Sequence, residues 1–133
     1  MAIEVCEELS IEIEDKPGAL AAALATISRA GVGVRAFCGY SMAGAGNVMV
    51  IPTDARKAKT ALKKAGYKSV GSSKVVLAVV PDKRGAGANL TERAYAKGIN
   101  LEYCYATGTG KGIGACVLAA GKDTAKLAKA LKS

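Results

Sequence analysis

The chain has 133 residues, a length that fits one ordinary domain or two very small ones. Half of the residues are hydrophobic, but there is no Trp and only one Phe, so we expect a thin core of small side chains. No apolar stretch is long enough for a membrane span, and the acidic N-terminus is the opposite of a signal peptide. These features predict a cytoplasmic protein that is not bound to a membrane.

The charge is unevenly distributed. The net charge is +8, yet residues 1–15 hold six acidic groups and no basic one. Many of the lysines fall in two helical stretches, where a solvated outer face is the favoured interpretation and binding to nucleic acid the less favoured one.

The four cysteines contain no C-x-x-C pair, and the chain has no His, so the sequence predicts free thiols and no metal site.

The first half of the chain alternates between the periodicities of strand and helix. Alternating apolar residues up to Ile13 indicate either one long strand that bends or two short strands. Leu20, Leu24 and Ile27 recur on one helical stripe that Gly31 ends. The predicted elements are strand 3–13, helix 17–30, strand 32–40, strand 48–51, a helix that Thr53 or Asp54 caps and Gly66 ends, and strand 67–70.

The second half begins with the most continuous apolar run, which is typical of a central strand. A glycine-rich turn over 107–112 separates two later strands. The predicted elements are strand 74–80, helix 85–97, strand 99–106, strand 113–119 and helix 122–132.

The two halves repeat one unit at an offset of 67 residues. The segment DKPGA at 15–19 corresponds to DKRGA at 82–86, and GVGV at 31–34 corresponds to GINL at 98–101. The order β-α-β-β-α-β predicts an antiparallel sheet with helices on one face, which is a ferredoxin-like unit. The fold class is therefore α+β, with a first repeat over 1–72 and a second over 73–133.

The second repeat lacks its own last strand, whereas the first has an extra strand over residues 2–7. We expect the extra strand to fill the open edge of the second repeat's sheet, in the same chain or in a partner.

The sequence DKPGAL at 15–20 and the GIN segment at 98–100, after the helix predicted over 85–97, resemble the ACT domain family. The resemblance covers nearly the whole chain as a tandem pair. It implies a non-catalytic regulatory protein that binds an amino acid or related carboxylate between repeats or subunits. It also implies a homodimer that signals to another protein and needs no cofactor.

The resemblance places the ligand against a strand-to-helix loop and the strand that follows the helix in a neighbouring unit. Backbone N–H groups at a helix start suit a carboxylate, and Asn100 offers both a donor and an acceptor. The equivalent of Asn100 in the first repeat is Gly33, so we expect one intact pocket. The implied ligand-binding residues are Lys16, Pro17, Gly18, Ala19 and Leu20 in the first loop, Arg84, Gly85, Ala86 and Gly87 in the second, and Asn100.

At the same offset Leu20 and Leu24 become Gly87 and Thr91. The helix predicted over 85–97 could therefore begin at Gly87, with Leu90 and Ala94 buried. This leaves open whether Gly85 or Gly87 faces a ligand.

Other functions are less favoured. Without His or a suggestive pair of carboxylates, acid–base catalysis has few candidates, and Asp15 and Asp82 are expected to cap helices. The glycine-rich segment 108–112 is not a phosphate loop, because Gly follows Lys111 and a strand follows the turn. An RNA-binding module that stacks bases on Tyr103 and Tyr105 is the nearest alternative, together with a ligand-free interaction module.

Overall fold

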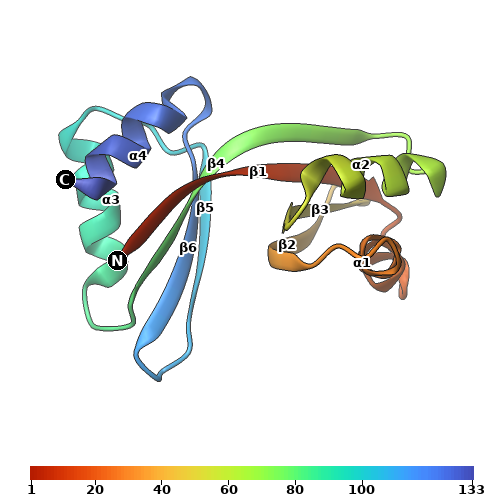
Figure 1. Cartoon of the computed structure of the whole chain (residues 1–133), viewed down its shortest axis with the longest axis horizontal. Coiled ribbons are helices and arrows are strands. Elements are labelled where there is room, and N and C mark those ends of the chain that lie inside the picture. Colours follow the sequence, from red (N-terminus) through yellow and green to blue (C-terminus); the bar gives the residue numbers. More distant parts are fainter. The chain divides into compact units, whose positions relative to one another are not determined.

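The computed structural model describes residues 1–133, which form six strands, four α-helices and one short 3-10 helix (Figure 1). The elements in chain order are β1 (Ala2–Ile13), α1 (Ala19–Arg29), β2 (Val34–Met42), β3 (Ala45–Pro52), α2 (Ala55–Lys64), β4 (Val70–Pro81), α3 (Ala86–Ala96), β5 (Tyr103–Gly108), β6 (Ile113–Ala119), η1 (Gly121–Asp123) and α4 (Thr124–Lys132).

The chain divides into two compact units, and two strands contribute to both. One unit comprises residues 7–73, and the other combines residues 1–6 with residues 74–133. The strands follow the order β2-β3-β1-β4-β6-β5. The unit of residues 7–73 thus uses β2-β3-β1-β4 and the other uses β1-β4-β6-β5, so each has the four-strand order of a ferredoxin-like fold.

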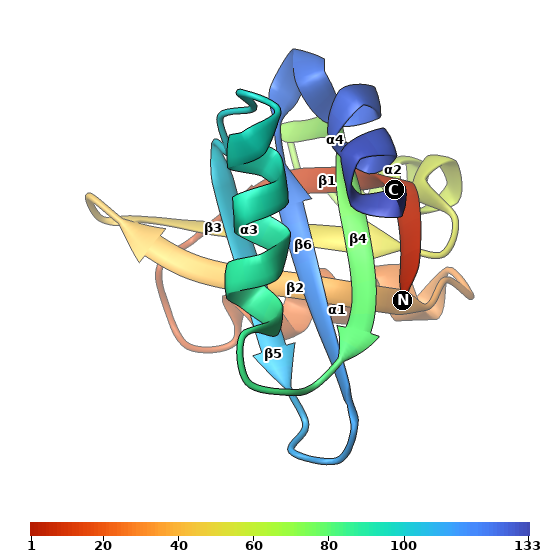
Figure 2. The same cartoon turned by 90° about the vertical axis from the view of Figure 1, so that its left-hand side faces the viewer.

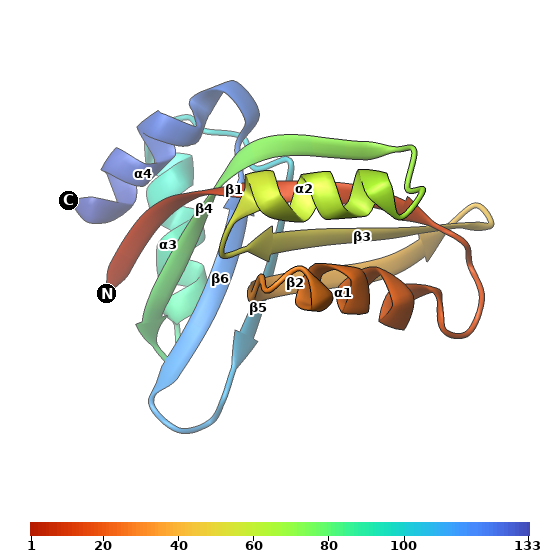
Figure 3. The same ribbon diagram turned by 45° about the vertical axis from the view of Figure 1, so that its right-hand side comes forward.

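The unit of residues 7–73 packs α1 and α2 against one face of its strands (Figure 3). Leu9 and Ile11 of β1 lie opposite Val50 and Val48 of β3 in an antiparallel ladder. All four side chains are fully buried with Ile27 of α1 and Leu62 of α2. The alternation predicted from the sequence therefore produces this core directly, because every second residue of a strand faces the helices.

The other unit packs α3 and α4 over β4, β6 and β5 (Figure 2). Its core contains Val76 and Ala78 of β4, Leu118 of β6, Leu90 of α3 and Leu127 of α4. Ile3 of β1 packs against this cluster. Residues 2–6 therefore act as the last strand of the second repeat within the same chain, which confirms the expected filling of its open edge.

The predicted strand over 67–70 is wrong in its extent. β4 begins at Val70 and runs without interruption to Pro81, so the last strand of the first repeat and the first strand of the second are one strand. Glu12 N donates to Ser69 O at 3.2 Å, and Ser72 Oγ donates to a Glu7 carboxylate oxygen at 2.6 Å. β1 is also one long strand, the first of the two alternatives left open by the sequence.

The predicted strand 99–106 is displaced as well, because β5 covers only Tyr103–Gly108. Ile99 is buried in the core, where it packs beneath the helices without belonging to the ladder. The apolar pattern therefore predicted correctly that Ile99 is buried. It did not predict where strand pairing begins, because that depends on the hydrogen bonds between β5 and β6.

The helices follow the sequence repeat closely. α1 and α3 begin and end 67 residues apart, and the buried pair Ala23 and Ile27 of α1 corresponds to Leu90 and Ala94 of α3. The large and small side chains have exchanged places between the repeats, so the packing volume is retained.

None of the helices is both long and apolar enough to cross a membrane, and all four cysteines are free thiols.

Removal of residues 2–6 is expected to expose the edge of β4 in the second unit. The variant should aggregate, and the β4 amides that face β1 should exchange with deuterium at least about tenfold faster than in the full chain. Hydrogen exchange measured by mass spectrometry checks this, with the β1–β3 ladder as the internal control. A variant whose solubility and exchange match those of the parent would contradict this assignment of the strand.

Candidate functional site

The helix starts that follow the two repeated loops are open to a ligand. Gly18 and Gly85 occupy the N-cap positions of α1 and α3 with φ of 86° and 85°, a left-handed conformation that glycine adopts without strain. Neither helix has a side-chain cap, whereas Asp54 caps α2 by accepting a hydrogen bond from Lys57 N at 3.0 Å. The first-turn N–H groups of α1 and α3 are therefore free of side-chain acceptors.

The start of α3 at Ala86 decides between the two glycines. Gly85 O accepts the hydrogen bond from Asn89 N at 2.8 Å, and Lys83 O accepts one from Ala86 N at 3.1 Å. Gly85 is therefore the N-cap and Gly87 belongs to the first helical turn.

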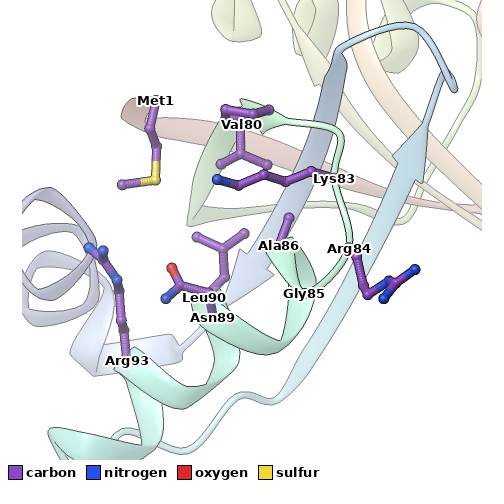
Figure 4. Close-up of a pocket in the computed structure, with 10 residues that line it drawn as sticks. Met1, Val80, Lys83, Arg84, Gly85, Ala86, Asn89, Leu90 and Arg93 are labelled. Atoms are coloured by element: carbon purple, nitrogen blue, oxygen red, sulfur yellow. The ribbon is translucent and has the colours of Figure 1, made fainter.

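A pocket of about 450 Å³ lies at this helix start, between the end of β4 and α3 (Figure 4). Its lining includes three cationic side chains and no Asp or Glu. Val80, Pro81 and Leu90 provide an apolar wall. The lining residues are Met1, Val80, Pro81, Lys83, Arg84, Gly85, Ala86, Asn89, Leu90 and Arg93.

The three cations are oriented differently. In Figure 4 Lys83 extends over the pocket toward Met1, and Arg93 lies on the same side, whereas the Arg84 guanidinium points to the opposite side of the loop. Arg93 is half-buried and its Nη1 donates to Leu131 O at 3.1 Å and to Ser133 O at 2.7 Å. The structure thus brings the predicted Arg84, Gly85 and Ala86 together with Lys83, Asn89 and Arg93, which sequence reasoning missed.

The spacing of residues along α3 could have identified Asn89 and Arg93 from the sequence. Ala86, Asn89, Leu90 and Arg93 follow one another at the three- and four-residue spacings of a single helix face.

Asn100 lies apart from this pocket. It is exposed, in the segment between α3 and β5, and it lines neither of the two pockets at this loop. The 11 residues of α3 separate it from Gly85, which corresponds to about 16 Å of helix rise. Gly85 and Asn100 of one chain therefore do not contact the same small ligand.

The first-repeat loop has different surroundings. Lys16 forms an exposed ion pair with Glu14 at 2.8 Å, and the hydrogen bond to Glu14 is the main cause of a raised Lys16 pKa. The pocket nearest to this loop has a volume of about 640 Å³ and includes Glu12, Glu14 and Asp15, with Thr26 at the position equivalent to Arg93. None of the predicted residues Lys16, Pro17, Gly18, Ala19 and Leu20 lines it. The two repeats therefore present pockets of opposite charge.

A second cavity of about 400 Å³ lies on the β5–β6 side of the Gly85 loop and is lined by Gly87, Ala106, Cys116 and neighbouring residues. Asp82 closes it toward the hairpin, because its carboxylate accepts from Gly110 N at 2.6 Å and its N–H donates to Gly112 O at 2.9 Å. Gly108 permits this approach, since a Cβ there would lie 2.6 Å from Asp82 Oδ1.

The expectation that Asp15 and Asp82 cap helices is therefore wrong. Both bind the hairpin of their own repeat, and Asp15 accepts from Ser41 Oγ at 2.8 Å. Tyr103 and Tyr105 are half-buried on β5 and both have interaction partners. No group of three or more candidate metal ligands is present in residues 1–133.

The two ferredoxin-like units form an ACT-like fold. Protein BT0572 from Bacteroides thetaiotaomicron is 27% identical over 98% of this chain and 88% of its own, with a TM-score of 0.85. The ligand-free regulatory subunit of aspartate kinase from Thermus thermophilus is 15% identical over 99% and 96%, with a TM-score of 0.71. Escherichia coli aspartokinase III, solved with aspartate and ADP, is 14% identical over 98% of this chain and 32% of its own, with a TM-score of 0.62.

The likeness to the aspartate kinases is one of fold, given its low sequence identity. No model of a protein family matches the sequence, and no curated protein sequence is significantly similar to it.

Replacement of Gly85 by Ala should destabilise the chain by about 1–2 kcal/mol, because a Cβ is strained in the left-handed conformation. Gly87→Ala is the matched control, since it lies in the helix with open space around it and should stabilise by about 0.5–1 kcal/mol. Urea denaturation measures both free energies of unfolding. The opposite order of the two variants would show that Gly87, not Gly85, caps α3.

Cys104 of β5 and Cys116 of β6 should differ in reactivity. Burial raises the pKa of Cys116 to about 11, and the neighbouring Cys104 raises it further. Since the thiolate is the reactive form, at pH 8 the Cys116 thiolate fraction should be about a hundredfold below that of an ordinary thiol. Iodoacetamide should thus label exposed Cys104 first, and Cys116 only near its pKa or after unfolding, as peptide mass spectrometry can show. Equal labelling rates in the folded chain would contradict this.

Proposed function

We propose that the chain is a non-catalytic regulatory protein that binds a small amino acid or a related carboxylate at the α3 pocket. The observation that carries the proposal is the combination of an uncapped helix start, the cationic side chains of Lys83 and Arg93, and an apolar wall around one pocket. The helix N-terminus and Lys83 favour a carboxylate, and Val80 and Leu90 suit its carbon chain.

The lining also supports a binding role in preference to a catalytic one. It contains no His, Cys, Ser, Asp or Glu, so it offers neither an activated nucleophile nor a carboxylate base. A ligand that binds only the folded chain would stabilise it and could shift the equilibrium between assembly states.

The remaining expectations from the sequence belong to this proposal. If Asn100 contributes to the same ligand as the Gly85 loop, it must come from a second copy, because α3 separates the two within one chain. A homodimer, a regulated protein partner and a cytoplasmic location fit this role. The fold of the aspartate kinase regulatory subunit supports it by analogy alone.

A thermal-shift screen of the full chain against the twenty amino acids and a set of small carboxylates tests the proposal. A ligand at about a hundred times its Kd should stabilise the chain by about 2.7 kcal/mol, visible as a rise in Tm. Lys83→Gln should reduce the rise to about half or less, whereas Lys111→Gln, an exposed substitution in the β5–β6 turn, should leave it unchanged. If no compound raises Tm, or if both variants respond equally, the α3 pocket is not the binding site.

A further inference from the structure

The α3 pocket contains no acidic side chain that could form an ion pair with an ammonium group. A free amino acid carries one positive and one negative charge at its α-carbon, and each needs a partner once it leaves water. Lys83, Arg84 and Arg93 line the pocket, and the lining contains no Asp or Glu. Asn89 provides the only side-chain oxygen of the lining, and Lys83 O and Gly85 O already accept hydrogen bonds from Ala86 and Asn89.

The pocket offers two separate anchors for negative charge. One is the uncapped start of α3 with Lys83 above it, and the other is the Arg93 guanidinium (Figure 4). Gly85 and Arg93 are eight residues apart, or about 12 Å of helix rise. The distance between the charges is shorter, because side chains on a helix lean toward its N-terminus.

Arg93 retains donors for a ligand. Its contacts with Leu131 O and Ser133 O both use Nη1. A guanidinium has five N–H donors in a planar arrangement, so those on Nε and Nη2 are left for a carboxylate, which they can bind in bidentate geometry. These contacts, one with Leu131 of α4 and one with Ser133 just after it, also hold the side chain in place.

From these observations we propose that the ligand is a short dicarboxylate or similar dianion without an ammonium group, bound between the α3 N-terminus with Lys83 and the Arg93 guanidinium. The inference rests on the proposed function of this pocket and narrows its ligand class. It applies to the second repeat only, because the first has Thr26 in place of Arg93 and acidic residues in the corresponding pocket.

Calorimetric titration of the full chain with succinate and L-aspartate tests the inference, because the two differ only in the ammonium group. Succinate should bind at least about tenfold more tightly than L-aspartate, and much more tightly than L-alanine or sulfate. L-Alanine represents the single-carboxylate zwitterions, and sulfate reports simple attraction of an anion.

Variants locate the two anchors. Lys83→Gln and Arg93→Gln should each weaken succinate binding at least about tenfold, and Lys111→Gln should not change it. Because Arg93 also binds α4, its variant is compared with the parent by Tm. Lys83→Gln replaces an exposed side chain, so it tests the pocket even where Arg93→Gln fails to fold.

The outcomes separate the two proposals. Equal or tighter binding of L-aspartate or L-alanine would overturn the dianion inference and leave the carboxylate-binding function in place. Succinate binding no tighter than sulfate would also overturn it, as adventitious anion binding only. If no carboxylate or amino acid binds, both proposals fail.

Discussion

The structure depends on two strands that each serve both compact units. β1 contributes residues 2–6 to one unit and 7–13 to the other, and β4 changes units between Ser73 and Lys74. The unit that contains residues 74–133 therefore completes its four-strand sheet with residues 2–6 from the other end of the chain, whereas the unit of residues 7–73 is continuous in sequence. Units of roughly 65 residues are near the lower limit for an independent core. Residues 2–6 supply hydrogen-bonding partners at the edge of β4, which would otherwise be open.

Gly18 and Gly85, the N-caps of α1 and α3, leave the helix starts after β1 and β4 without a side-chain hydrogen-bond acceptor. A left-handed glycine turns the chain sharply into α1 or α3 and contributes no side chain to the helix start. The same geometry in both repeats leaves the first-turn N–H groups available to an anion. Asp15 and Asp82 do not compete for these groups, because their carboxylates are bound to the β2–β3 and β5–β6 hairpins.

The repeats have retained their packing and diverged in charge. Ala23 and Ile27 exchange sizes with Leu90 and Ala94 while the core remains closed. Thr26 and Arg93 occupy equivalent positions, yet one lines an acidic pocket and the other a cationic one. The core tolerates little change in total volume, whereas a pocket wall in contact with water accepts a change of charge at low cost.

The sequence by itself determined the repeat, the fold class and the positions of the helices, because helix periodicity and glycine stops are local signals. It also predicted Arg84, Gly85 and Ala86 as ligand-binding residues, and these three line the α3 pocket. Only the tertiary structure decided that β4 is one strand from Val70 to Pro81 and that β5 begins at Tyr103, since strand hydrogen bonds join residues distant in sequence. It also placed Arg93 and Lys83 at one pocket and Asn100 beyond the other end of α3, because the orientation of a helix face depends on what the helix packs against.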